Sequence, residues 1–166
     1  METEIYILVV EDESEVLDSI IRDIESFEDV FPIETASTAE EAREVIAEIS
    51  QKEARLGLLL CDHLLPGEDG VDLLISLNKQ EAYKNAKKVL ITGQAGLEDT
   101  VQAVNNANLD HYIAKPWDKE QLQEVVRNQL TTYVIEQNID PLPFMSMLDA
   151  ERLAASMRDS GRFSDT

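Results

Sequence analysis

The chain has 166 residues, of which 43% are apolar, 29% charged and 5% aromatic. Its 34 acidic and 14 basic residues give a formal net charge of −20, which disfavours direct binding of nucleic acids because their phosphates carry the same sign. The single cysteine excludes a disulfide framework and a metal site with several cysteine ligands. No apolar run is long enough to span a membrane, and the amino terminus lacks the basic flank of a signal peptide. We therefore expect a cytoplasmic protein without membrane contact, built as one domain with an appendage.

Short apolar runs alternate with helical patterns along the chain. The runs are rich in strand-forming residues and too short for helices, so each predicts a buried strand. The predicted strands are Ile5–Val10, Phe31–Ala36, Leu56–Cys61, Lys88–Ile91 and Asp110–Ala114. Apolar positions at helical spacing follow each strand, and these helical faces start at Val16, Ala42, Val71, Leu97 and Leu122. The alternation predicts an α/β fold of the (βα)5 type, in which a doubly wound parallel sheet is covered on both faces.

Polar residues follow four of the predicted strands. Glu11 and Asp12 follow the first strand, Asp62 the third, Thr92 the fourth and Lys115 the fifth. Ligands of open parallel sheets bind beyond the carboxyl ends of the strands, where the strand order reverses. In a flavodoxin-like order, 2-1-3-4-5, the first and third strands are neighbours, which would bring the three carboxylates together. Because unpaired carboxylates repel one another, this arrangement predicts a hard divalent cation such as Mg²⁺.

These side chains suggest phosphoryl transfer. A carboxylate beside Mg²⁺ can attack a phosphoryl group and form an aspartyl phosphate, while the hydroxyl of Thr92 and the ammonium of Lys115 would bind the phosphoryl oxygens. Each residue alone has an ordinary interpretation, since Asp62 can cap a turn and Lys115-Pro116 can begin a loop. Their occurrence at the ends of successive strands favours a common site.

The sequence resembles the receiver domain of two-component response regulators over roughly Ile5 to Leu130. The resemblance rests on Glu11-Asp12, the stretch Asp62-His63-Leu64-Leu65-Pro66-Gly67-Glu68-Asp69-Gly70, Ile91-Thr92-Gly93 and Tyr112-Ile113-Ala114-Lys115-Pro116. It implies that Asp62 accepts a phosphoryl group from a histidine kinase. It also implies that Glu11, Asp12, Asp62 and the backbone carbonyl of Leu64 hold Mg²⁺.

The resemblance further implies a switch. Lys115 would pair with the phosphoryl oxygens, and the Lys115-Pro116 peptide bond is expected to be cis. Thr92 would move toward the phosphoryl group and the ring of Tyr112 would follow it inward, which alters the face formed by the fourth helix, fifth strand and fifth helix. By analogy with the family, Leu64 and Gln94 tune the lifetime of the phosphoryl group, and an apolar Leu64 favours slow self-dephosphorylation.

Other candidate residues have ordinary interpretations that we prefer. His63 suggests a phosphohistidine relay, but the neighbour of the acceptor in a strand faces the opposite way. His111 is expected at the surface, where it tunes the output face, and Cys61 is expected to be a small buried filler. Trp117 either anchors the entry of the fifth helix or belongs to a partner surface.

We expect a receiver domain over residues 1–130 and a carboxyl-terminal extension over residues 131–166. The extension contains a break at Asp140-Pro141-Leu142-Pro143. Ser146 and Asp149 resemble a capping box before a short helix, whose apolar side would be Leu148, Leu153, Ala154 and Met157. The extension is too short for an independent DNA-binding or enzymatic domain. We expect it to pack on the receiver, mediate a dimer or lead to an output domain.

The sequence thus predicts a phosphorylation-controlled receiver and not a turnover enzyme for small molecules. Its partners would be a histidine kinase or phosphotransfer protein, and a downstream effector protein or fused output domain. A homodimer through the fourth helix, fifth strand and fifth helix, or through the extension, stays open. The main alternative is a receiver-like interaction scaffold that works without phosphorylation. A flavin or nucleotide binder is disfavoured because an acidic pair, and not a glycine-rich phosphate loop, follows the first strand.

Overall fold

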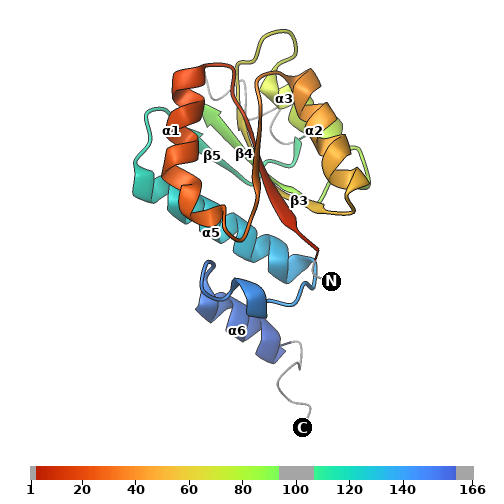
Figure 1. Cartoon of the computed structure of the whole chain (residues 1–166), viewed down its shortest axis with the longest axis vertical. Coiled ribbons are helices and arrows are strands. Elements are labelled where there is room, and N and C mark those ends of the chain that lie inside the picture. Colours follow the sequence, from red (N-terminus) through yellow and green to blue (C-terminus); the bar gives the residue numbers. More distant parts are fainter. Residues whose placement is uncertain (1–2, 94–106, 160–166) are drawn as a thin grey trace.

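Five parallel strands form one sheet at the centre of the molecule (Figure 1). The structure is a computed structural model, and it describes residues 3–93 and 107–159. The strands are β1 (Ile5–Val10), β2 (Ile33–Ala36), β3 (Arg55–Asp62), β4 (Lys87–Thr92) and β5 (His111–Ala114). They lie in the order β2-β1-β3-β4-β5, and each neighbouring pair is parallel. The predicted fold class and strand order are confirmed.

The helices cover the two faces of the sheet (Figure 1). They are α1 (Ser14–Ile24), α2 (Ala39–Gln51), α3 (Gly70–Asn78), α5 (Lys119–Glu136) and α6 (Ala150–Asp159), with short 3-10 turns η1 (Glu25–Phe27) and η2 (Leu142–Phe144). The face predicted for the fourth helix, which contains Leu97, Val101 and Val104, lies outside the described residues. Within residues 3–93 and 107–159, no helix has both the length and the apolar content that crossing a membrane requires.

The side chains of the strands pack into two separate hydrophobic cores, one on each face of the sheet. Ile7 of β1 packs in the core beneath α1 and α5, whereas the next residue, Leu8, packs in the core beneath α2 and α3. All six residues of β1 are buried, as are those of β4. A strand buried on both faces shows no polar alternation, which is why β1 is visible in the sequence as a continuous apolar run. β4 is buried as well, although it contains two lysines and a threonine.

The second predicted strand begins too early. Phe31 and Pro32 were expected in this strand, but β2 begins at Ile33. The Phe31 amide instead donates to the Phe27 carbonyl at 2.8 Å in the turn after η1, and the Phe31 side chain is fully buried in the core beneath α1 and α5. The apolar residue in the sequence therefore marks core packing at the entrance to the strand and not a strand position.

The carboxyl-terminal segment packs against the receiver fold. α5 continues to Glu136, beyond the position where the extension was expected to start, and η2 and α6 follow beneath it (Figure 1). The ring of Phe144 stacks on that of Phe31 with centroids 5.2 Å apart. Arg152 of α6 donates to the Thr132 hydroxyl at 2.8 Å and to the Asn128 carbonyl at 3.3 Å. These contacts join α6 to the core that contains α1 and α5.

The capping box predicted for the last helix is wrong in its position. The helix begins at Ala150, directly after Asp149, and the Asp149 carboxylate accepts from the Arg152 amide at 3.2 Å. The Asp149 amide donates to the Thr131 hydroxyl at 3.1 Å. Asp149 therefore caps the helix in place of Ser146, because this position also lets its backbone bond to α5.

Replacing Leu153 tests how firmly α6 is docked. Leu153 is fully buried in the core beneath α1 and α5. We expect Leu153→Ala to lower the free energy of unfolding by about 2–4 kcal/mol, because burial is lost and a cavity remains. Glu151→Ala, at an exposed position of the same helix, should change it by about 0.5 kcal/mol or less. Urea unfolding measures both, and equal losses would contradict the docking of α6.

Candidate functional site

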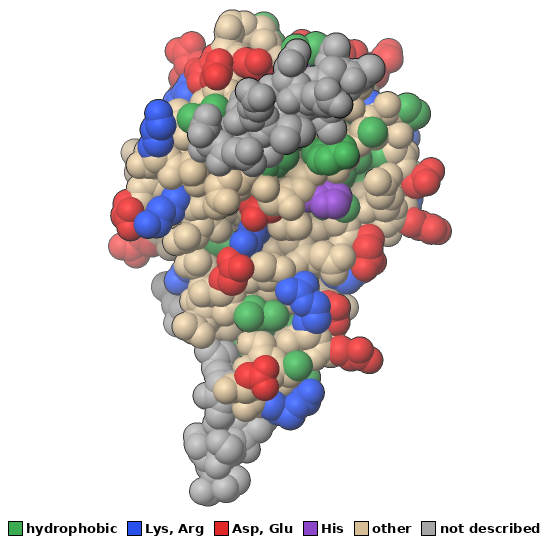
Figure 2. All heavy atoms as spheres, turned by 180° about the vertical axis from the view of Figure 1, so that it is seen from behind, with side chains coloured by type: hydrophobic (Ala, Val, Ile, Leu, Met, Phe, Trp, Pro, Cys, Tyr) green, Lys and Arg blue, Asp and Glu red, His purple; other side chains and the backbone are tan. Residues whose placement is uncertain are grey.

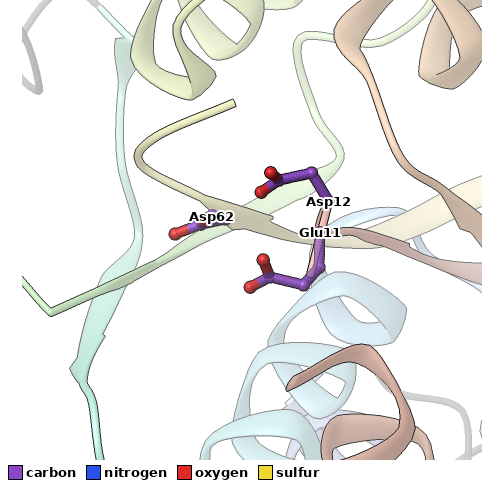
Figure 3. A group of neighbouring side chains, drawn as sticks. All are labelled: Glu11, Asp12 and Asp62. Atoms are coloured by element: carbon purple, nitrogen blue, oxygen red, sulfur yellow. The ribbon is translucent and has the colours of Figure 1, made fainter. Parts of the chain in front are cut away.

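Three carboxylates meet at the carboxyl edge of the sheet (Figure 3). Glu11 and Asp12 directly follow β1, and Asp62 is the last residue of β3. The two strands are neighbours whose pairing ends with Val10 opposite Cys61, so the chain delivers these side chains to one place. One oxygen from each carboxylate lies within 4.8 Å of the others. Glu11 and Asp62 are buried, whereas Asp12 is exposed. The structure thus brings together the three carboxylates that were predicted to meet.

Lys115 lies between two of these carboxylates. It follows β5, and its Nζ is 3.0 Å from Glu11 Oε1 and 3.2 Å from Asp62 Oδ1. The Lys115-Pro116 peptide bond is cis, as expected. Burial alone would lower the pKa of Lys115, but the hydrogen bond to Glu11 and the charge of Asp62 raise it above its ordinary value. Lys115 therefore remains an ammonium whose donors face the carboxylates.

The site carries more negative than positive charge. Three carboxylates lie together, and one ammonium is hydrogen-bonded to two of them. The pKa of Glu11 is raised, chiefly because burial removes water from the carboxylate; the Glu13 amide, which donates to it at 3.1 Å, and Lys115 oppose this shift. A buried carboxylate that resists ionisation, beside two others, favours a proton or a cation.

Thr92 lies beside a residue that we had not assigned to the site. Thr92 ends β4 and is buried, and its Oγ1 is 3.5 Å from Nδ1 of His63. The opposite ring nitrogen of His63 is 4.0 Å from Asp69 Oδ1. Asp62 pairs with Ile91, so His63 and Thr92 lie next to each other just beyond this pair. The sequence carried no signal for this contact, because it does not set the register of β3 against β4.

The other predicted site residues lie at the rim. Leu64 is 53% exposed in the loop between β3 and α3, and Tyr112 is 49% exposed on β5. The ring of Tyr112 therefore points outward, with its centroid 6.3 Å from that of His111. Gln94 lies outside the described residues. The exposure of the Leu64 side chain does not bear on its backbone carbonyl, so the assignment of that carbonyl as a metal ligand stays a prediction.

Cys61 and Trp117 have structural roles in this arrangement. Cys61 is fully buried, and burial raises the pKa of its thiol far above the ordinary value, so it is an inert filler as expected. Trp117 donates from Nε1 to Asp23 Oδ2 at 2.9 Å, which ties the entrance of α5 to α1. This contact agrees with the anchoring interpretation of Trp117.

Gly70 allows the chain to close behind Asp62. A Cβ atom at this position would collide with the carbonyl oxygen of Asp62. The Gly70 amide donates to the His63 carbonyl at 3.0 Å, so the loop that leaves the site returns to its own starting point. Glycine is needed here because two backbone segments approach each other closely.

Acidic side chains are spread over the surface beyond the site. Figure 2 shows them on several parts of the face opposite to that of Figure 1, without one dominant patch. This distribution agrees with a net charge that is mostly solvated. The charge at the sheet edge differs because two of its carboxylates are buried.

Comparisons with known proteins agree with this site. The family model described as "Response regulator receiver domain" matches residues 7–127. The chain is 31% identical over 121 residues to the hydrogenase transcriptional regulatory protein HoxA of Cupriavidus necator, covering 73% of this chain and 23% of that protein. It is 27% identical over 126 residues to the response regulator Rre1 of a Synechocystis species, covering 76% of this chain and 52% of that protein. The chain thus spans about a quarter to a half of these relatives.

Solved structures give the same result. A CheY-like response regulator receiver domain protein from Methanospirillum hungatei is 31% identical with a TM-score of 0.67, covering 81% of this chain and 99% of that one. The receiver domain of NtrX from Brucella abortus is 29% identical with a TM-score of 0.62, covering 76% of this chain and 98% of that one. Together with the family match over most of the chain, these likenesses mean that the chain belongs to the response regulator receiver domains of two-component systems.

Proposed function

We propose that this receiver accepts a phosphoryl group on Asp62 from a histidine kinase or a phosphotransfer protein. The observation that carries the proposal is the position of the Asp62 carboxylate, which lies beside Glu11 and Asp12 and 3.2 Å from the ammonium of Lys115. A nucleophilic carboxylate next to a fixed cation is suited to a phosphoryl group, because the cation binds the oxygens that carry the charge. The chain modifies itself in this reaction and turns over no small-molecule substrate.

Mg²⁺ fits the residues at this site. Glu11, Asp12 and Asp62 offer carboxylate oxygens within reach of a single ion, and the backbone carbonyl of Leu64 would add a neutral oxygen. Mg²⁺ prefers oxygen ligands and is usually held by one or two carboxylates together with waters and phosphate oxygens. When bound, the ion would neutralise charge on the carboxylates and on the incoming phosphoryl group. The excess negative charge and the raised pKa of Glu11 support this assignment.

The chain's own residues then perform distinct tasks. An Asp62 oxygen forms the bond to phosphorus while the bond between phosphorus and the donor breaks, and the donor group keeps that electron pair. The ammonium of Lys115, now hydrogen-bonded to Asp62, would turn to the oxygens of the transferred group. Thr92 would donate its hydroxyl to the same oxygens, which requires it to leave the position beside His63.

Signal output would follow from the movement of Thr92. Tyr112 is exposed on β5, and its ring would turn inward when Thr92 shifts. This motion would bias an existing equilibrium of the face formed by the fourth helix, β5 and α5. We propose that this face, or the docked carboxyl-terminal segment, contacts an effector protein, an output domain or a second copy. The HoxA relatives are named transcriptional regulatory proteins, so control of transcription through a separate output domain is one such effect.

Intact mass tests the phosphoacceptor. With Mg²⁺ and acetyl phosphate, the unmodified chain should gain one phosphoryl group and Asp62→Ala should gain none. Asp72→Ala removes an exposed carboxylate on α3 and should behave like the unmodified chain. Labelling that persists in Asp62→Ala would place the acceptor elsewhere. No labelling of the unmodified chain by the donor or by a histidine kinase would favour the phosphorylation-independent scaffold.

Removing the buried charge of Glu11 tests the proposed metal site. Without Mg²⁺, Glu11→Gln should raise the free energy of unfolding by about 1 kcal/mol, because it removes a desolvated carboxylate beside Asp62. A raised folded-state pKa means that ionisation of Glu11 costs stability as the pH rises through it, so the gain should shrink in acid. Urea unfolding with and without Mg²⁺ measures these effects.

The same experiment separates metal binding from simple charge removal. Mg²⁺ should stabilise the unmodified chain and Glu13→Gln, which changes an exposed carboxylate two residues from Glu11. It should stabilise Glu11→Gln much less. Equal stabilisation of all three proteins by Mg²⁺ would exclude Glu11 from the metal site.

A further inference from the structure

An ion pair outside the site holds the loop that leaves it. Arg43 of α2 and Glu68 of the loop between β3 and α3 form two parallel hydrogen bonds, Nη1 to Oε1 and Nη2 to Oε2, each of 2.6 Å. Nη2 of Arg43 also donates to the Ser76 hydroxyl of α3 at 2.9 Å, and this hydroxyl donates to the Leu73 carbonyl at 2.7 Å. Forked pairs of this kind fix orientation as well as distance.

The pKa values of Glu68 and Arg43 both shift in the direction that favours the charged form. The hydrogen bond to Arg43 lowers the pKa of Glu68, and the hydrogen bond to Glu68 raises the pKa of Arg43. Both groups therefore stay charged near neutral pH. The side chains are 38% and 35% exposed, so solvent screens their attraction and the pair contributes modestly to overall stability. We therefore consider the effect of the pair on the position of the loop between β3 and α3.

Arg43 is itself held on a fixed support. Its neighbours Ala42 and Ile46 are buried in the core beneath α2 and α3, so the backbone of α2 is fixed to the sheet. Through Arg43, this helix reaches across to a loop that begins at the acceptor Asp62. Because Arg43 and Glu68 are 25 residues apart in the chain, the pair restrains the loop from outside.

Backbone hydrogen bonds tie the loop at its two ends, and within it the Glu68 amide donates to the Pro66 carbonyl at 3.1 Å. The His63 amide donates to the Ile91 carbonyl at 3.0 Å, and the Gly70 amide donates to the His63 carbonyl at 3.0 Å. Between these ends the chain turns at Gly67, where φ is +84°, and Leu64 is 53% exposed. Glu68 lies next to this turn, so its bond to Arg43 restrains the part of the loop that contains Leu64.

The pair also gives the carboxylate of Glu68 a hydrogen-bond partner outside the metal site. The loop contains Glu68 and Asp69 close to Asp62 in the sequence, but Glu68 is bonded to Arg43 and Asp69 accepts from the Val71 amide at 3.1 Å. Among the described residues, the carboxylates that share a position suited to a metal ion are Glu11, Asp12 and Asp62. Both acids of the loop therefore have hydrogen-bond partners of their own.

We infer that Arg43 and Glu68 are positioning residues which hold the loop between β3 and α3 in the arrangement that binds a divalent cation. The inference rests on the proposed function, since it concerns the Leu64 carbonyl of the proposed metal site. If the loop leaves this arrangement part of the time, the apparent affinity for the cation equals the intrinsic affinity multiplied by the fraction of time that the loop spends in the arrangement.

Titration with Mg²⁺ alone, followed by amide shifts in ¹⁵N-labelled protein, tests this role. Glu68→Gln and Arg43→Met should each weaken Mg²⁺ binding about three-fold, since a screened pair restrains the loop only in part. The double variant should be no weaker than either single variant, because the two residues act as one unit. Arg43→Lys keeps the charge without the fork and should restore part of the affinity.

Glu124→Gln is the matched control. Glu124 of α5 also pairs with an arginine, as Arg127 Nη1 donates to it at 3.1 Å. This variant should bind Mg²⁺ like the unmodified chain. Hydrogen exchange without Mg²⁺ should become faster at residues 63–70 in Glu68→Gln and should not change there in Glu124→Gln.

The outcomes separate the two proposals. Unchanged Mg²⁺ affinity in both Glu68→Gln and Arg43→Met, with binding intact in the unmodified chain, would overturn the positioning role and leave the proposed function standing. An absence of Mg²⁺ binding in the unmodified chain would overturn the metal site and the positioning role together. Additive losses in the double variant would show that the residues do not act as a pair.

Discussion

The pairing of β1 with β3 is the constraint on which the site depends. These strands are separated in the sequence by α1, β2 and α2, yet they lie side by side in register up to Val10 and Cys61. This places Glu11 and Asp62 together at a buried edge. Gly57 supports the pairing near its other end, where a Cβ atom would collide with the side chain of Ile5 and the register shifts between Tyr6 and Ile7. Apolar packing on both faces thus holds like charges in place.

The burial of these charges costs stability. Glu11 resists ionisation because it has lost water, and Lys115 compensates only part of the local negative charge. A bound cation or the loss of one carboxylate would stabilise a site of this kind. Perturbed carboxylates are typical of functional sites, where the arrangement of charges lowers the stability of the fold. In the proposed reaction, the ammonium of Lys115 would need little rearrangement to reach the phosphoryl oxygens, because it is already hydrogen-bonded to Asp62.

The two ends of the sheet are supported differently. At the carboxyl edge, the loop after β3 is restrained by its backbone, by Gly70 and by the pair of Arg43 with Glu68. At the opposite end, η2 and α6 cover the core through Phe144, Leu153 and hydrogen bonds to α5. The first set of contacts consists mainly of hydrogen bonds, one pair of which is partly exposed. The second set is mostly apolar and buried, so it fixes the framework on which the site is built.

The sequence by itself determined the strands and the residues that follow each strand, and its resemblance to receiver domains implied the strand order. β1, β3 and β4 contain the apolar runs typical of buried parallel strands. The polar residues that follow the strands are equally visible, so Glu11, Asp12, Asp62 and Lys115 were all identified. Only the tertiary structure decided which side chains bond to one another. The contact of Lys115 with Glu11 joins residues 104 positions apart, and the pair of Arg43 with Glu68 and the position of His63 beside Thr92 follow no local periodicity. Phe31 and Asp149 were misplaced for the same reason, since packing against distant segments overrode the local pattern.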